Sequence, residues 1–378
     1  MKAGVFFSNN MNSLVAGREA SAGAVAVSGP PALTLVFTTD DYIQAMVLEG
    51  IKKNVGSSLI AGFCCAGVIT SGGVRGQGVG VMTLNGDLHA ATVLQKGLGN
   101  DPYGTGRKTG QALLESGINK GTAIIMPDGF QAGISEMLRG LYSEMGPDFQ
   151  YIGGGAGDNL KFFKTYQFTE QELSDNALAV ALVQGLNVGL GVGHGWSPAG
   201  NPLVITKSRG KRVYELDGSP AFIEYSRRLG RITRDQFPVV AMKHPLGFAN
   251  ISGEFIIRDP LNVNDDQSID FVTEVPSQAV GYIMEGRMGS LIRAAREAAQ
   301  EAVSSIDDPG FMLLFDCISR SLFMGDGFNG EIEAILETVG PDVPMLGALT
   351  FGEVGCYDRV PLFQNKTTVV SVGGKPSS

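Results

Sequence analysis

Apolar and polar positions follow one another in the same order three times along the chain. Each time, a short apolar run typical of a buried strand leads into apolar residues at helical spacing, and a second apolar run ends in a glycine-rich loop. The first apolar runs occupy residues 33–37, 123–129 and 311–317. Because strands that alternate with helices form sheets covered by helices, the pattern predicts an α/β protein of mixed α+β character.

The helix in each repeat is predicted from a stripe of apolar side chains three and four residues apart. Thr39 or Asp40 is expected to cap the first helix, since both side chains can accept a hydrogen bond from its unpaired N–H groups. The stripes are Ile43, Met46, Val47 and Ile51 in the first repeat, Ile134, Met137, Leu138 and Leu141 in the second, and Ile332, Ile335, Leu336 and Val339 in the third.

Glycine makes up 53 of the 378 residues, and glycine-rich loops recur at the ends of the repeats. These loops are IAGFCCAG at 60–67, YIGGGAGD at 151–158 and MLGALTFGEVG at 345–355. The distance from the first strand to the loop differs among the copies, which indicates divergent duplications and not a solenoid with a tight period. We expect divergent strand–helix–strand repeats that form two packed, sheet-containing halves.

A block of different character, residues 196–306, lies between the second and third repeats. It opens on WSPAGNP, a sequence typical of a loop. The domain boundary is therefore expected near residue 200, with an N-terminal domain over 31–200 and a C-terminal domain over 201–373.

Composition narrows the classes of partner. The formal net charge of −9 argues against nucleic acid and anionic lipid, which carry the same sign. Four cysteines and the lack of a secretory leader favour a reducing cytosol, so we expect a cytoplasmic protein. The uncharged stretch 176–206 is interrupted by glycines and amides, and residues 177–184 within it are predicted to be a buried strand.

The glycine loops resemble phosphate-binding loops in spacing, but two of them are followed by acidic residues where a phosphate site needs a cation. GFCCAG and GALTFG have the G-x4-G spacing without the following Lys and Ser or Thr. Asp158 follows one loop and Glu353 follows another, and a carboxylate there repels phosphate. Such a site suits a small zwitterion, whose ammonium pairs with the acids while its carboxylate takes N–H groups. Alternatively, the glycines form tight connections and the acids are turn residues.

The sequence FDCISR places Asp316, Cys317 and Arg320 at the end of an apolar strand, where ligand groups collect in α/β proteins. Arg320 could clamp a carboxylate, or it could form a structural pair with Asp316. Cys317 as a nucleophile would need a neighbouring base, and no histidine is joined to it by a local signature. A thiol enzyme is therefore a third hypothesis, without a supported catalytic constellation.

Metal chemistry has little support in the sequence. No spacing of Cys and His is typical of zinc, so no metal site is predicted. A single histidine can ligate haem iron without leaving a motif, and the candidates are His194 in GHGWSP and His244 in KHPLG.

Over residues 31–373 the chain resembles the FIST family, a sensory module with an N-terminal and a C-terminal region. The motifs that carry the resemblance, in order, are GFCCAG, IGGGAGD, VITKSRGKRVYELDGSPA, HPLG, FDCISR and LGALTFGEVG. The resemblance implies ligand sensing in signal transduction, with amino acids as ligands and a separate signalling protein such as a kinase as partner. It also implies the haem-based sensing of a gas such as NO as an alternative. The chain departs from the family at Asn365, where many members carry a histidine.

The resulting hypothesis is a ligand-binding sensor that is not an enzyme and needs no cofactor, unless haem is bound. The glycine loops of the repeats are expected to face one pocket that binds an amino acid or a similar zwitterion. The expected ligand-binding residues are Gly153, Gly154, Gly155, Asp158, Cys317, Arg320, Thr350, Gly352 and Glu353.

Overall fold

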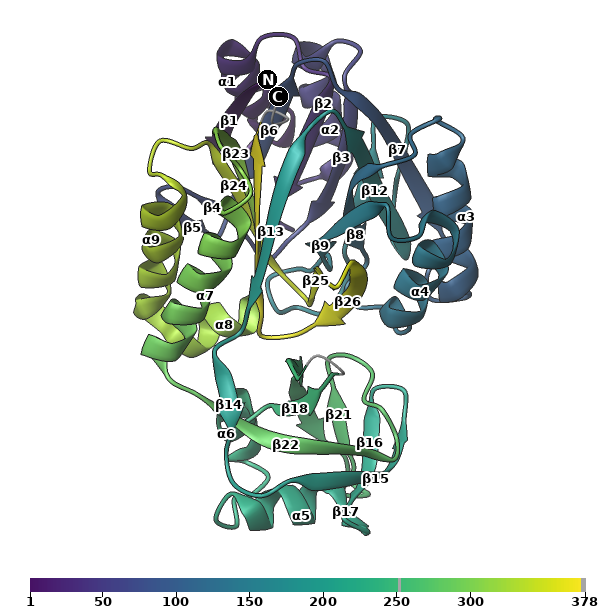
Figure 1. Cartoon of the computed structure of the whole chain (residues 1–378), viewed down its shortest axis with the longest axis vertical. Coiled ribbons are helices and arrows are strands. Elements are labelled where there is room, and N and C mark those ends of the chain that lie inside the picture. Colours follow the sequence, from purple (N-terminus) through teal and green to yellow (C-terminus); the bar gives the residue numbers. More distant parts are fainter. Residues whose placement is uncertain (251–252, 375–378) are drawn as a thin grey trace.

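The computed structural model describes residues 1–250 and 253–374. It contains three sheets of related topology and a fourth, antiparallel sheet inserted into the third repeat (Figure 1). The mixed α/β class predicted from the sequence is confirmed. Within the described residues, no helix combines the length and the apolar character that crossing a membrane requires.

The first unit contains more elements than the sequence indicated. Its elements are β1 (Lys2–Ser8), α1 (Ser13–Ser28), β2 (Leu33–Thr38), α2 (Gln44–Val55), β3 (Leu59–Cys64), the hairpin of β4 (Gly67–Thr70) and β5 (Gly73–Arg75), and β6 (Val79–Asn85). The strand β1 and the helix α1 were not predicted, and both recur as equivalent elements in the other units.

The second unit repeats this order without an insertion. Its elements are β7 (His89–Lys96), α3 (Pro102–Leu114), β8 (Gly121–Pro127), α4 (Ile134–Met145), β9 (Phe149–Gly154), the hairpin of β10 (Gln167–Thr169) and β11 (Leu173–Ser174), and β12 (Ala177–Gln184). The buried strand predicted over residues 177–184 is therefore confirmed.

The third unit has the same order, with the inserted segment between its first strand and first helix. Its elements are β13 (Asn187–Gly193), α7 (Met288–Val303), β23 (Pro309–Cys317), α8 (Ile318–Met324), the short 3-10 helix η1 (Gly325–Gly327), α9 (Phe328–Val339), β24 (Met345–Thr350), the hairpin of β25 (Glu353–Tyr357) and β26 (Val360–Gln364), and β27 (Thr368–Gly374).

The inserted segment forms a separate sheet with two short helices. Its elements are β14 (Trp196–Pro198), β15 (Leu203–Arg209), β16 (Arg212–Leu216), β17 (Ser219–Pro220), α5 (Ala221–Arg228), α6 (Phe237–Lys243), β18 (Leu246–Ala249), β19 (Phe255–Arg258), β20 (Pro260–Val263), β21 (Ile269–Phe271) and β22 (Ala279–Gly286). Figure 1 shows this part at one end of the molecule, joined to the three sheets by the β13–β14 and β22–α7 connections.

The three units share one pattern of strand pairing. The pairs β2–β3, β8–β9 and β23–β24 are parallel, and in each sheet the last strand of the unit returns antiparallel beside the first member of the pair. The hairpins are exchanged between sheets. That of the first unit joins the third sheet, that of the second joins the first, and that of the third joins the second.

One core lies where the inner faces of the three sheets meet. Phe37 and Phe63 of the first sheet contact each other with ring centroids 4.9 Å apart, and Phe315 of the third sheet lies 5.7 Å from Phe37. The outer face of each sheet packs on its own helix pair, so each sheet is buried on both sides. Burial on both sides explains why the central strands are continuous apolar runs.

The prediction that the apolar helical stripes are buried is confirmed in part. Val47 and Ile51 are buried, but Ile43 and Met46 are 62% and 36% exposed, so half of the first stripe faces solvent. The expected cap at Thr39 or Asp40 is wrong, because α2 begins later, with Ile43 at its N-cap and no side-chain cap. All four apolar residues of the second stripe are buried.

The glycine-rich loops of the three units contact one another through the backbone. The N–H of Gly157 donates to the carbonyl of Cys64 at 3.0 Å, and the N–H of Gly155 donates to that of Gly352 at 2.8 Å. A Cβ atom on Gly157 would lie 1.9 Å from the ring of Phe351. The glycines here permit close packing of the three loops, as expected if they form tight connections between strands.

Candidate functional site

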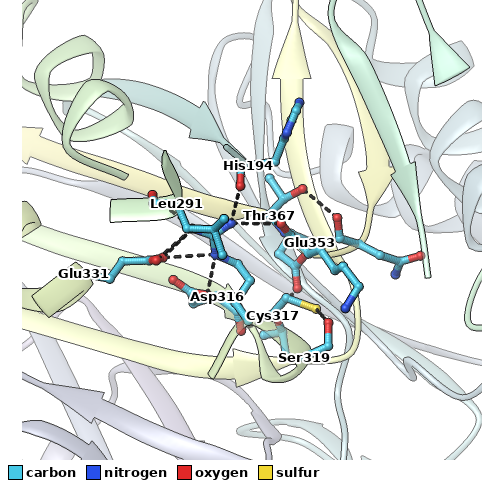
Figure 2. A network of polar contacts seen from close by, with 12 residues as sticks. His194, Leu291, Asp316, Cys317, Ser319, Glu331, Glu353 and Thr367 are labelled. Atoms are coloured by element: carbon cyan, nitrogen blue, oxygen red, sulfur yellow. Dashed lines mark hydrogen bonds and ion pairs between the residues drawn. The ribbon is translucent and has the colours of Figure 1, made fainter. Parts of the chain in front are cut away.

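A buried polar network lies at the carboxyl ends of β23 and β24, where the third sheet meets the inserted sheet (Figure 2). Asp316 and Cys317 end β23, and Arg320 follows in α8. Thr350 ends β24, and Glu353 begins β25. The strand–helix and strand–turn junctions therefore bring five polar side chains to one place, each at most 4% exposed.

Arg320 is the centre of the network. Its guanidinium binds Glu331 of α9 through Nε and Nη2, with the shortest distance 2.8 Å. It also donates to the carbonyls of His194 at 2.6 Å, Lys366 at 3.0 Å and Leu291 at 3.3 Å. Sequence reasoning placed a ligand carboxylate at Arg320, whereas here Glu331 takes that position from within the chain.

Asp316 lies beside this pair, 3.5 Å from the Nε of Arg320. Burial, and then the neighbouring charge of Glu331, raise the pKa of Asp316 well above its ordinary value, although Arg320 acts in the opposite direction. Neither carboxyl oxygen of Asp316 has a hydrogen-bond partner among the described residues. Asp316 and Glu331 thus share a single arginine, and this arrangement favours the neutral form of Asp316.

Glu353 is held on the other side of Cys317. Its carboxyl group accepts from Oγ1 of Thr350 at 2.8 Å and from the N–H of Thr367 at 3.3 Å, and burial raises its pKa to about 8. Burial, and then the charge of Glu353, also raise the pKa of the Cys317 thiol. A protonated thiol is a poor nucleophile, so the environment of Cys317 does not favour a thiol enzyme.

The inserted sheet closes the network through Lys366. Its Nζ lies 3.2 Å from Oδ1 of Asp259, which follows β19, and both side chains are buried. The same ammonium group lies 5.3 Å from the ring centroid of Trp196. Asn365 adds a second link, because its Oδ1 accepts from Oγ1 of Thr273 at 2.7 Å.

Sequence reasoning missed Glu331, Asp259 and Lys366. Their charges are common on surfaces, and no local motif marks them as buried. The one signal that could have found Lys366 is its place two residues before an apolar strand, in FQNKTT.

The glycines predicted as ligand-binding residues lie beside the network. Gly153 and Gly154 pair with Val354 and Glu353 across the β9–β25 ladder. A Cβ atom on Gly154 would lie 2.5 Å from Cγ2 of Thr350. These loops are therefore brought together with Thr350 and Glu353, and the role of their glycines in ligand binding stays a prediction.

Asp158 has a different place. It is 1% exposed, and its carboxylate accepts hydrogen bonds from the backbone N–H groups of Lys161, Phe162 and Phe163 at 2.8 to 2.9 Å. It lines a cavity of about 360 Å³ with Asp40 and Tyr42 of the first unit. Neither Arg320 nor Glu353 is among the described residues that line this cavity, so the structure does not bring Asp158 together with them.

A cavity of about 470 Å³ adjoins the network at the β13–β14 connection between the third sheet and the inserted sheet, and helix α7 forms its other wall. Two residues of its wall bond to the network. The carbonyl of His194 accepts a hydrogen bond from Arg320, and Nε1 of Trp196 donates to the carbonyl of Lys366 at 3.2 Å. We call it the hinge cavity. Its polar lining consists of His194, Glu254, Ser290, Arg293, Glu297, Glu301 and Tyr357.

The hinge cavity carries charges of both signs. Three of its lining residues are glutamates, and its arginine, Arg293, lies on the same helix as Glu297 and Glu301. Burial, and then the charge of Glu254, raise the pKa of Glu301. The acids thus lie close enough to repel one another, and a bound cation would relieve that repulsion.

His194 does not fit as a ligand of haem iron. Its Nδ1 accepts the backbone N–H of Trp196 at 2.9 Å, and burial lowers its pKa to about 4, so the ring is neutral with its hydrogen on Nε2. Ligation through Nε2 would need that hydrogen on Nδ1, which would break the bond to Trp196. His244, at the end of α6, is not among the residues that line the hinge cavity.

Comparisons with known proteins place the chain in a family. A FIST N domain matches residues 32–219 and a FIST C domain matches residues 221–356. The uncharacterized protein MJ1623 of Methanocaldococcus jannaschii is 26% identical over 200 residues, which are 49% of this chain and only 38% of that relative's length. Among solved structures, the structure of PurLQS from Thermotoga maritima matches with 11% identity and a TM-score of 0.21, over 99% of this chain and 73% of that one. Because the two family matches cover most of the sequence, the chain belongs to the FIST family, whose domains are associated with sensory signal transduction.

Proposed function

We propose that the protein is a sensor that binds an amino acid, or a similar small zwitterion, in the hinge cavity. The observation that carries the proposal is the position of this cavity. It is lined by the β13–β14 connection, by helix α7 and by Glu254 of the inserted segment, and His194 and Trp196 join its wall to the buried network. Ligand sites occur preferentially at such interfaces between parts of a chain.

The charges of the cavity support a zwitterion over a simple anion or cation. Arg293 offers a cation to the ligand carboxylate, and Glu297 and Glu301 offer anions to its ammonium group. A volume of about 470 Å³ is within the range of small-molecule sites. The amino acid proposed from the glycine loops is thus retained, with a different set of charged contacts.

The signal would pass through the network. A ligand bound in the hinge cavity would change the orientation of Trp196, whose ring lies beside the ammonium group of Lys366. Lys366 in turn pairs with Asp259 of the inserted segment. The inserted sheet would then move relative to the three-sheet core, and a separate signalling protein such as a kinase would bind one of the two arrangements. The free state of all four cysteines supports a cytoplasmic location.

Isothermal titration of the protein with each amino acid tests the proposal. At least one is expected to bind, and Arg293→Met should weaken its affinity about tenfold or more, because a charged hydrogen bond is lost. Arg296→Met is the matched control, since Arg296 lies on the same helix but pairs with Glu337 at an exposed position. Flat titrations for every amino acid, or equal affinity of Arg293→Met and wild type, would overturn the proposal.

A further inference from the structure

The cavity of about 360 Å³ beside Asp158 plays no part in the proposed hinge site. It lies where β2 leads into α2, and the loop between β9 and β10 forms its other wall. Two units of the three-sheet core therefore contribute residues to it. Asp40 and Tyr42 come from the first unit, and Asp158, Lys161 and Phe163 come from the second.

Negative charge exceeds positive charge at the inner end of this cavity. Lys161 forms an ion pair with Oδ2 of Asp40. The hydrogen bond to Asp40, followed by the charges of Asp40, Asp41 and Asp158, raises the pKa of Lys161. Three carboxylates thus act on one ammonium group. Lys164, which also lines the cavity, is paired with Asp175 at 3.0 Å.

Two polar atoms at this end have no hydrogen-bond partner within the part of the chain that the structure describes. They are Oδ1 of Asp40 and the hydroxyl of Tyr42, whose side chain lines the cavity and is only 5% exposed. Buried carboxylate and hydroxyl groups are almost always hydrogen-bonded in folded proteins. Both atoms are shielded from water, so a ligand with several N–H donors would satisfy them once the side chains of Asp40 and Tyr42 turn toward the cavity.

The mouth of the cavity is apolar. Ile43 is 62% exposed and Phe163 is 86% exposed, although both are large hydrophobic side chains. Ile43 lies at this mouth and not in the core because it occupies the N-cap position of α2. An apolar group on the ligand would cover both side chains.

We infer that this cavity binds a small primary amine with an apolar body, its ammonium group on Asp40 and Tyr42 and its apolar part against Ile43 and Phe163. Both lysines among the described residues that line the cavity are already paired with acids, so neither is free to bind a ligand carboxylate. This separates it from the hinge cavity, where Arg293 lies among glutamates.

Titration with 2-phenylethylamine tests the inference, with 2-phenylethanol as the neutral probe of equal shape. The amine should bind and the alcohol should bind at least tenfold more weakly, because only the ammonium group gains from the carboxylates. Asp40→Asn should weaken amine binding about tenfold, and Tyr42→Phe should weaken it several-fold. Lys161→Met should strengthen it, since the competing cation is removed from Asp40.

The gain expected for Lys161→Met keeps the test decisive if Asp40→Asn fails to fold, because a loss of structure does not raise affinity. Arg293→Met should bind the amine as wild type does, so the two cavities are tested separately. No binding of the amine at millimolar concentration, equal binding of the alcohol, or loss of binding in Arg293→Met would each overturn the inference.

Discussion

Glu353→Gln isolates the energetic effect of a carboxyl group buried in the network. The glutamate accepts from Thr350 and from the backbone at Thr367, and burial raises its pKa from an ordinary value of 4.5 to about 8. Glutamine has nearly the shape of the protonated acid, but it cannot ionise. Its oxygen can accept from the N–H of Thr367 while its NH2 group donates to Oγ1 of Thr350, whose hydroxyl can donate to the carbonyl of Asp316 instead.

The sign of the effect follows from proton binding. Between pH 4.5 and 8 the unfolded chain loses the proton of Glu353 while the folded chain keeps it, so the stability of the wild type falls as pH rises. A shift from 4.5 to about 8 corresponds to on the order of 5 kcal/mol at its full extent. Below this window Glu353 contributes no pH dependence. Above it the full cost is present.

Urea unfolding at pH values from 5 to 8.5 measures this dependence, and Trp196, the only tryptophan of the chain, reports it by fluorescence. Glu353→Gln should become more stable relative to the wild type as pH rises, by several kcal/mol over the range. Glu337→Gln is the control, because that side chain is 66% exposed and should show a constant difference. A constant difference between Glu353→Gln and the wild type would refute the reasoning.

Two further predictions concern packing and charge. Lys366→Met should lower the free energy of unfolding by about 3–5 kcal/mol, because it leaves Asp259 buried without its ion-pair partner. Urea unfolding should show much of this loss recovered in the double variant with Asp259→Asn, and no recovery would contradict the pairing. Gly157→Ala should cost about 1–3 kcal/mol, since the new Cβ would lie 1.9 Å from a phenylalanine ring. Gly76→Ala, whose new Cβ would meet nothing within 4 Å, should be close to neutral in the same urea unfolding measurement.

Local pattern was enough to find the repeats but not the way they join. The apolar runs and the second helical stripe, including Met137 and Leu141, are buried as predicted, because burial on one face of a helix leaves its period in the sequence. The exchange of hairpins depends on pairing between distant segments, such as Ala348 with Val68. Neither segment carries a local signal for its partner.

The missed helix α1 has a physical explanation. Its buried residues are small, among them Ala16, Gly17, Ala20 and Ala24. A Cβ atom on Gly17 would lie 2.3 Å from the carbonyl oxygen of Val47, so the two helices approach closely there. A face made of small residues lacks the large apolar side chains from which an amphipathic helix is predicted.

Part of the candidate site was also predictable. The end of an apolar strand pointed to Cys317 and Arg320, and the glycine loop pointed to Thr350 and Glu353, all of which meet in one network. The partner of Arg320 was not predictable, because Glu331 lies on a separate helix and looks like any surface glutamate in the sequence.

The exchange of hairpins has a consequence for synthesis of the chain on the ribosome. The hairpin β4–β5, made early, completes its pairing only with β24, which is among the last strands to be made. Until residue 350 has left the ribosome, the edge formed by β4 stays without its partner and open to other nascent chains. Completion of the fold thus depends on its final quarter, and a chaperone that shields this edge should raise the yield of folded protein more than one that acts on the inserted sheet.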